Sequence, residues 1–106
     1  MREPIHLSPT CIFDPDSESI IRRGKVNRLT DVRYRILECL VERMGEIVSA
    51  ETIMTYVWGG RQRATRENFN VQMLRLRRRI EVDYRTPKLI LTIRGSGYML
   101  VQDKGI

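Results

Sequence analysis

The segment 66–80 constrains the fold of this chain most, because an apolar stripe and a basic cluster run through the same residues. Phe69, Met73, Leu76 and Ile80 recur at the spacing of one side of an α-helix. At about 100° per residue, the side away from this stripe carries Asn68, Val71, Gln72, Arg75 and Arg79. A helix with one side built for a core and with Arg, Gln and Asn on the other meets the requirements for reading the major groove of DNA.

The alternative interpretation of this helix is a solvated surface. Charged residues on an exposed helix face usually serve only to keep that face solvated, and such a face usually carries both positive and negative side chains. Here four arginines lie within residues 75–79, and three more lie within residues 61–66. The only acidic residues close to the four in the sequence are Glu67 and Glu81. This excess of one sign favours a binding face over a solvated one.

Length and composition limit the class of protein. A chain of 106 residues is expected to form one domain, 1–106, around a single modest core. Its 42% hydrophobic and 30% charged residues are typical of a globular protein rather than a disordered one. The formal net charge of +6 favours a polyanionic partner, with nucleic acid first and an acidic membrane surface second.

The remaining compositional signals point to the cytoplasm. No apolar run approaches the roughly 18–20 residues that span a bilayer, and residues 1–4 do not lead into the apolar core of a signal peptide. Cys11 and Cys39 each lie among apolar neighbours, so we expect two buried free thiols rather than a disulfide or a metal site. His6 has no Cys or His at ligand spacing, and we expect no metal, no cofactor and no catalytic site.

Turn signals divide the chain into three parts. Residues 1–29 predict short strands of a small antiparallel sheet, and residues 30–85 predict a helical core. Thr30 is the expected N-cap of a first helix that ends at Gly45, and Ser49 is the expected N-cap of a second helix closed by Gly59-Gly60. The third helix is expected to run from about residue 66 to residue 83, before Thr86-Pro87.

The last part, 88–101, predicts a β-hairpin. Leu89–Ile93 is rich in strand formers, Arg94-Gly95-Ser96-Gly97 forms a reversal, and Tyr98–Val101 returns as a strand. Gly95 and Gly97 permit positive φ and leave no bulk between the tip and a sugar-phosphate strand. The order predicts an α+β winged helix-turn-helix, with an N-terminal sheet, a three-helix core and a C-terminal hairpin wing.

The chain resembles the OmpR/PhoB-type winged-helix DNA-binding domain of bacterial two-component response regulators. The similarity extends from about Ile5 to Val101 and rests on the following segments: Leu29-Thr30 with Tyr34 and Leu37, Gly45–Ser49, Val57–Gly59, Asn70–Met73, Arg75–Arg78 and Thr92–Tyr98. The resemblance implies a four-stranded N-terminal sheet and sequence-specific binding to promoters, commonly by two domains in tandem on direct repeats. It also implies that the loop 60–65 contacts RNA polymerase.

Five residues depart from the pattern of the family. Arg33 stands where the family usually has Glu, Asn70 where it has Asp, and Gln72 where it often has His. Leu74 replaces a frequent basic residue, and Met99 stands where many members place Arg. These departures bear on the sequence of the DNA site rather than on the fold.

The exposed side of the third helix supplies the candidate base-reading residues. The guanidinium fork of Arg75 matches guanine O6 and N7, and the amide of Gln72 matches adenine N6 and N7. Val71 suits a thymine methyl group, and Asn68 is a further candidate; each real base contact is worth about 1–3 kcal/mol of discrimination. The candidate phosphate-binding residues, which set the register on DNA, are Arg66, Arg77, Arg78, Arg79, Arg94 and Ser96.

Two other functions compete with sequence-specific regulation of transcription. Winged helices also dock proteins, so the chain could be an interaction module that binds RNA polymerase through the loop 60–65. RNA binding is the third hypothesis, and it is disfavoured because the sequence shows no row of exposed aromatic residues for stacking unpaired bases.

Overall fold

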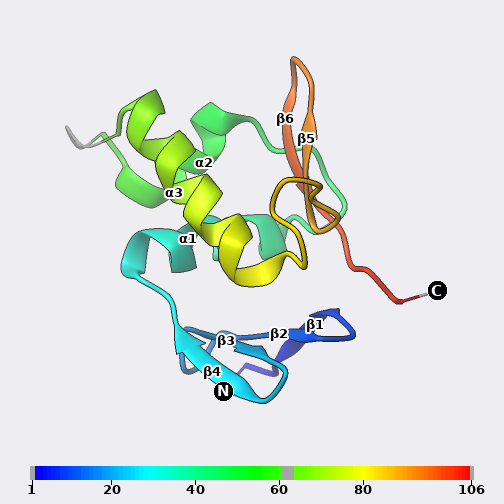
Figure 1. Cartoon of the computed structure of the whole chain (residues 1–106). Coiled ribbons are helices and arrows are strands. Elements are labelled where there is room, and N and C mark those ends of the chain that lie inside the picture. The colour runs from blue at the N-terminus through cyan, green and yellow to red at the C-terminus, as the bar shows by residue number, and fades with distance from the viewer. Residues whose placement is uncertain (1, 61–63, 106) are drawn as a thin grey trace.

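The computed structural model describes residues 2–60 and 64–105. Four strands open the chain: β1 (Ile5–Ser8), β2 (Cys11–Asp14), β3 (Ser19–Arg22) and β4 (Lys25–Arg28). Three helices follow: α1 (Asp31–Glu42), α2 (Ala50–Trp58) and α3 (Arg66–Ile80). The hairpin of β5 (Ile90–Ile93) and β6 (Gly97–Leu100) completes the predicted α+β winged helix (Figure 1).

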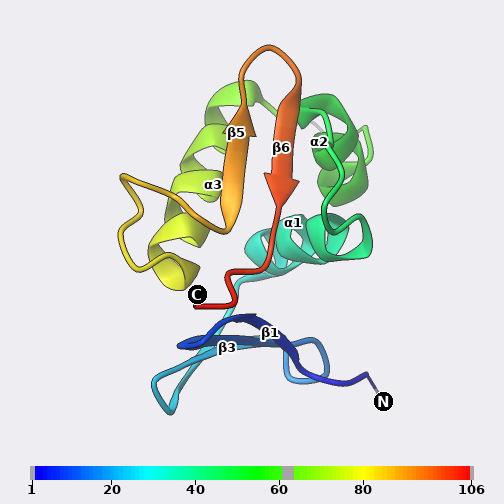
Figure 2. The same cartoon turned by 90° about the vertical axis from the view of Figure 1, so that its right-hand side faces the viewer.

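The N-terminal sheet is an antiparallel meander in the order β1-β2-β3-β4. Phe13 and Ile20 are paired across β2 and β3, and both are buried, as are Leu7 and Cys11. Figure 2 shows that the sheet lies below the helices, while the tip of the wing points away from it. The sheet therefore closes one end of the domain and leaves the other end to the wing.

The core lies where the three helices meet the sheet and the wing. Leu37 and Leu40 of α1 contribute to it together with Ile53 of α2 and Leu76 of α3. Trp58, the last residue of α2, is also buried. None of the helices in the described parts of the chain is long and apolar enough to cross a membrane.

Both cysteines are free and buried, which confirms the sequence prediction. Burial raises the pKa of the Cys11 thiol to about 11, and burial also raises the pKa of Cys39. The neutral thiol is therefore the dominant form at physiological pH, and both side chains act as small apolar groups in the core.

The structure places Thr30 and Ser49 at the predicted N-cap positions and corrects the predicted ends of two helices. Ser49 Oγ accepts a hydrogen bond of 3.1 Å from the backbone N–H of Thr52, whereas the Thr30 side chain makes no capping bond. The first helix ends at Glu42, before the predicted Gly45. The third helix ends at Ile80 rather than near residue 83, because Glu81 adopts an extended backbone.

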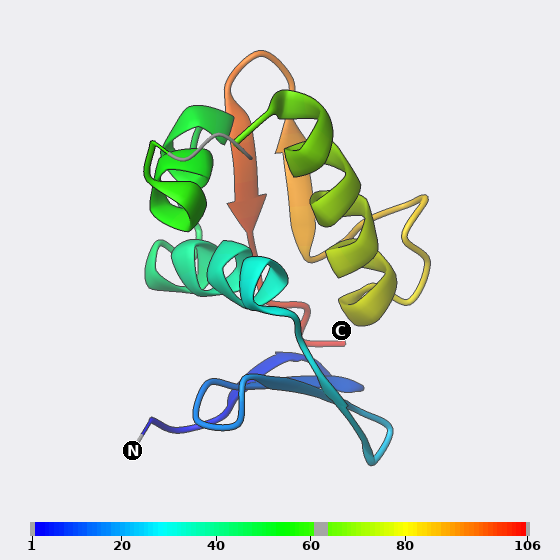
Figure 3. The same cartoon turned by 90° about the vertical axis from the view of Figure 1, so that its left-hand side faces the viewer.

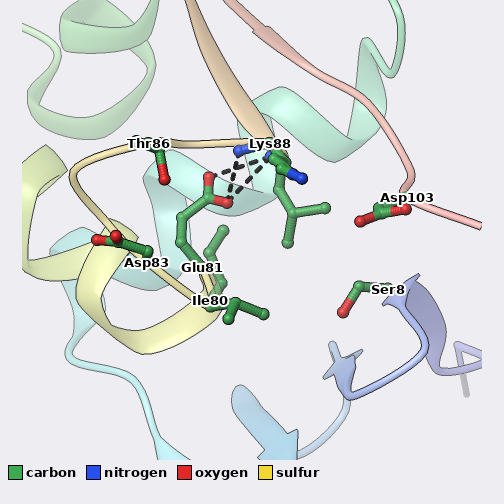
Figure 4. A pocket seen from close by; sticks show the side chains of 9 residues that line it. Ser8, Ile80, Glu81, Asp83, Thr86, Lys88 and Asp103 are labelled. Carbon is green, nitrogen blue, oxygen red and sulfur yellow. Dashed lines mark hydrogen bonds between the residues drawn. The ribbon is translucent and has the colours of Figure 1, made fainter. Parts of the chain in front are cut away.

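Glu81 explains why α3 stops there. Its side chain is 3% exposed, and its carboxylate accepts hydrogen bonds from the backbone N–H groups of Lys88, Leu89 and Ile90 at 2.9–3.1 Å (Figure 4). A buried carboxylate is costly unless it is hydrogen-bonded, and here three consecutive N–H groups satisfy it. This Glu81 clamp joins the end of α3 directly to the start of β5, above a hollow that Ser8 and Asp103 border on the other side.

A backbone bridge joins the wing to the segment before α2. Val48 and Tyr98 form an isolated antiparallel bridge. Gly97 has a φ of 148°, and a Cβ at this position would fall on the carbonyl oxygen of Val48. A glycine is therefore needed at position 97 for the contact with Val48, rather than for the predicted approach to a sugar-phosphate strand. Gly95, at a φ of 78°, is surrounded by open space.

Candidate nucleic-acid interface

The two-sided character of α3 is confirmed by the burial of its side chains. Phe69, Met73, Leu76 and Ile80 are at most 2% exposed. The opposite face, which we call the outer face, comprises the exposed residues Glu67, Val71, Leu74, Arg75 and Arg78. Figure 3 shows α3 on the outside of the domain, with no other element lying in front of it. The outer face is therefore accessible to a partner as large as a DNA duplex.

Arg75 lies on the outer face, on the side next to α1. Its side chain is exposed, and it forms no hydrogen bond or ion pair within residues 2–60 and 64–105. Val71, one turn earlier, is 44% exposed, and Leu74 beside it is 40% exposed. Within the described part of the chain, the outer face thus presents an unpaired guanidinium next to two apolar side chains.

One flank of α3 faces α1 and contains two of the predicted base-reading residues. Arg33 of α1 donates through Nε to Oε1 of Gln72 at 3.2 Å. Gln72 in turn donates through Nε2 to Oδ1 of Asn68 at 3.4 Å. Gln72 and Asn68 therefore lie at the side of the outer face rather than at its centre, and their polar groups are already engaged within the protein.

The other flank of α3 faces the wing, where Arg77 lies half-buried. Its Nη2 donates to the carbonyl of Ile90 and to Oγ1 of Thr92, both at 2.8 Å. The guanidinium also lies 5.7 Å from the centre of the Tyr98 ring, and burial lowers the pKa of Arg77. Tyr98 packs edge-on against Phe69, with ring centres 5.5 Å apart. Arg77, which the sequence placed among the phosphate-binding residues, thus directs its guanidinium toward the wing.

The remaining predicted phosphate-binding residues lie on the outer face or around it. Arg66 forms an ion pair of 3.2 Å with Glu51 of α2, and Arg78 stacks on the Tyr84 ring at 4.7 Å. Arg79, near the C-terminal end of α3, is exposed; Arg94 and Ser96 are exposed at the tip of the wing on either side of Gly95. A hollow bordered by Arg66, Thr92 and Ser96 lies between the wing and the first residues of α2 and α3.

Sequence reasoning missed three residues that shape this surface. Arg33 is noticed in the sequence only as a departure from the family, because a contact between α1 and α3 leaves no local pattern. Leu74 is noticed only as a departure from the family, although its spacing of three residues from Val71 and four from Arg78 places it on the exposed side of the helix. In the sequence, Glu81 is noticed only as an acidic residue close to the arginines, yet its carboxylate accepts hydrogen bonds from backbone N–H groups such as that of Ile90.

The described residues contain no group of three or more His, Cys, Asp or Glu side chains that could hold a metal ion. What the surface offers instead is positive charge, hydrogen-bond donors and two exposed apolar side chains on one helix, with a second basic site at the wing tip. These are the chemical features of a surface that binds duplex DNA.

Residues 24–100 match a protein family described as "Transcriptional regulatory protein, C terminal". Over 82 residues the chain is 39% identical to the transcriptional regulatory protein PcoR of Escherichia coli, covering 77% of this chain and 36% of PcoR. It is 35% identical over 86 residues to the DNA-binding dual master transcriptional regulator RpaA of a Synechocystis strain, covering 81% of this chain and 36% of RpaA. The chain therefore spans about a third of the length of these curated relatives.

Solved structures agree with this relationship. The response regulator DrrB of Thermotoga maritima, an OmpR/PhoB homologue, superposes with a TM-score of 0.76 at 27% identity, over 87% of this chain and 42% of DrrB. The DNA-binding domain of Klebsiella pneumoniae RstA, solved in complex with the RstA box, has the same fold, with a TM-score of 0.76 at 20% identity over 94% and 98% of the two chains.

The chain belongs to the OmpR/PhoB-type family of winged-helix effector domains of response regulators. It is a DNA-binding domain of a transcription regulator and not an enzyme, in agreement with the sequence prediction.

Proposed function

We propose that this domain binds specific promoter sequences in duplex DNA, with α3 in the major groove and the wing on the backbone or in the neighbouring minor groove. The observation that carries the proposal is the state of Arg75, which is exposed on the outer face and unpaired within the described residues. An arginine in this state loses no internal contact when it turns its fork to guanine O6 and N7.

The other residues divide by their position around Arg75. Val71 and Leu74 suit apolar contacts to thymine methyl groups. Gln72 and Asn68, which bond each other while Gln72 also bonds Arg33, suit bases at the edge of the groove once Asn68 and the Gln72 amide exchange their mutual bond for one to DNA. Arg78, Arg79, Arg94 and Ser96 suit phosphate contacts that fix the register, and Arg66 suits one once it leaves Glu51. The inward bonds of Arg77 support a role in holding the wing against α3 instead.

The partners beyond DNA rest on the resemblance to the family. We propose tandem binding of two copies to direct repeats and a contact between RNA polymerase and the loop 60–65, of which residues 61–63 lie outside the described structure. A bacterial regulator that binds promoters acts in the cytoplasm, where the chromosome lies. Gel-shift titration on one repeat and on two would test the tandem arrangement, since cooperative binding is expected only on two.

Selection of bound fragments from genomic DNA by the purified chain tests the proposed function. We expect a recurrent sequence motif that contains a guanine. Because phosphate contacts dominate the affinity of such complexes, log K should also fall with log salt at about −0.9 per phosphate neutralised. Equal binding to the selected fragments and to random duplexes would overturn sequence-specific recognition, and tighter binding to single-stranded RNA than to duplex DNA would support the competing RNA hypothesis.

A further inference from the structure

The flank of α3 that faces α1 carries an unusual arrangement of charge. Gln72, Arg75 and Arg79 follow one another at helical spacing along this flank, and Arg33 reaches it from α1 through its bond to Gln72. The ion pairs within residues 2–60 and 64–105 involve Arg2, Arg35, Arg66 and Arg85. The described structure thus brings three arginines together here without a carboxylate that neutralises them.

This arrangement is electrostatically unfavourable in the free domain. The pKa of Arg33 lies below its ordinary value, first because burial disfavours the charged form and then because Arg75 and Arg79 repel it. A role confined to holding α1 against α3 would be served better by a carboxylate or a neutral side chain at this position. An anion bound beside Arg33 would relieve the repulsion.

We propose that Arg33 is a phosphate-binding residue of the DNA interface, held in place from α3 by Gln72. Only Nε of its guanidinium is engaged, by Oε1 of Gln72; neither terminal nitrogen has a hydrogen-bond partner within the described residues. Both Nη groups are therefore available to the oxygens of a single phosphate, in the two-pronged geometry that guanidinium groups favour.

The phosphate belongs to a DNA backbone rather than to a small free anion, because the flank borders the outer face of α3. A duplex whose major groove receives Val71 and Arg75 has a phosphate strand along each side of that helix. Arg33 lies on the side next to α1, opposite the wing, so the two strands would be contacted from α1 and from the wing respectively. This inference rests on the proposed function, since it requires α3 to enter the groove.

The test measures how DNA affinity depends on salt. The dissociation constant of the full chain for a random-sequence 30-base-pair duplex is measured from low to physiological salt, for the wild type and for Arg33→Ala. Loss of one phosphate contact should reduce the slope of log K against log salt by about 0.9. Arg33→Lys keeps a charge and should retain most of the slope.

Arg35→Ala is the matched control, because Arg35 lies on the same helix, carries the same charge and pairs with Asp31 at 3.2 Å. Its slope should equal that of the wild type. An unchanged slope for Arg33→Ala overturns the inference, as does an equal reduction for Arg35→Ala. Thermal unfolding of each variant shows whether it folds. If Arg33→Ala does not fold, the salt dependence of Arg33→Gln is measured in its place.

The outcome for Arg33 can be separated from the outcome for the proposed function. If Arg75→Ala lowers the preference for the selected motif while Arg33→Ala leaves the slope unchanged, the proposed function stands and the inference fails. If the wild type shows no preference for any motif, the proposed sequence-specific function fails, whereas the Arg33 slope on random duplex still decides the phosphate contact.

Discussion

The backbones of Val48 and Tyr98 exchange two hydrogen bonds, each 2.8 Å long, between the segment that precedes α2 and the second strand of the wing. This exchange gives the two-stranded wing a third, very short strand on its inner side. It is possible only because residue 97 has no side chain, since a Cβ there would occupy the position of the Val48 carbonyl oxygen.

Gly97→Ala should therefore displace the wing and destabilise the domain. Forcing extra volume into a packed position costs about 1–3 kcal/mol, and the φ of 148° adds strain for any side chain. Urea unfolding followed by circular dichroism measures the loss. Gly95→Ala is the matched control: its φ is 78° but its surroundings are open, so only about 1–2 kcal/mol of backbone strain is expected. A smaller loss for Gly97→Ala than for Gly95→Ala would contradict the role of the bridge.

Arg75→Ala should reduce sequence discrimination more than overall affinity. Loss of a two-pronged contact to guanine costs about 1–3 kcal/mol, which corresponds to roughly a 5- to 150-fold weaker binding of the selected site. Binding to random duplex should fall much less. Parallel titrations of both duplexes provide the ratio, and an equal fall on both would assign Arg75 to a phosphate rather than to a base.

Replacement of thymine by uracil in the selected site tests the apolar pair Val71 and Leu74. Uracil lacks only the 5-methyl group, so the change removes an apolar contact without altering the hydrogen bonds of the base. Each buried methyl-sized group contributes about 0.8 kcal/mol, or roughly a fourfold change in Kd. The same substitution should have little effect on the variant Val71→Ala with Leu74→Ala. If uracil weakens the wild type and the double variant equally, the methyl group is not read by these residues.

Glu38 should make the domain less stable in acid. Its carboxylate accepts hydrogen bonds from Arg2, Tyr34 and Tyr56 at 2.7–3.1 Å. Burial alone would raise the pKa of Glu38, but these three donors outweigh burial and hold the pKa below its ordinary value of 4.5. The folded-state pKa is thus lower than the unfolded one, so the stabilisation is complete above pH 4.5 and is lost as the pH falls through the folded-state pKa.

Thermal unfolding between pH 3 and pH 7 measures this dependence. Glu38→Gln should flatten the acidic part of the curve, and Glu67→Gln, which removes an exposed carboxylate from the outer face of α3, is the control. A curve for Glu38→Gln that coincides in shape with that of the wild type would show that the carboxylate is not responsible.

The periodic parts of the fold could be predicted from the sequence. The stripe from Phe69 to Ile80 identified the buried side of α3, and the turn signals around Gly95 identified the wing, because both patterns are local. The end of α3 could not be predicted, since a glutamate at position 81 is compatible with a helix until the N–H groups of residues 88–90 are seen to meet it.

The site was predicted less completely, for a similar reason. Helical spacing separates the exposed from the buried side, but it does not show which exposed side chains are occupied by neighbours. The sequence assigned Arg75 to a base and Arg77 to a phosphate; within residues 2–60 and 64–105 Arg75 is unpaired, whereas Arg77 bonds Ile90 and Thr92. Arg33 lies 39 residues from Gln72, so its contact appears only in three dimensions.

The Glu81 clamp has a consequence for how the domain adapts to DNA. With three backbone N–H groups fixed on one carboxylate, the last turn of α3 and the first residue of β5 form a rigid corner. A hinge at that corner would let α3 and the wing enter two grooves of the DNA independently. The domain would then lose conformational freedom when it binds. Without the hinge, the separation between the two is already set in the unbound domain, so the DNA, rather than the protein, must bend or twist when consecutive grooves do not fit.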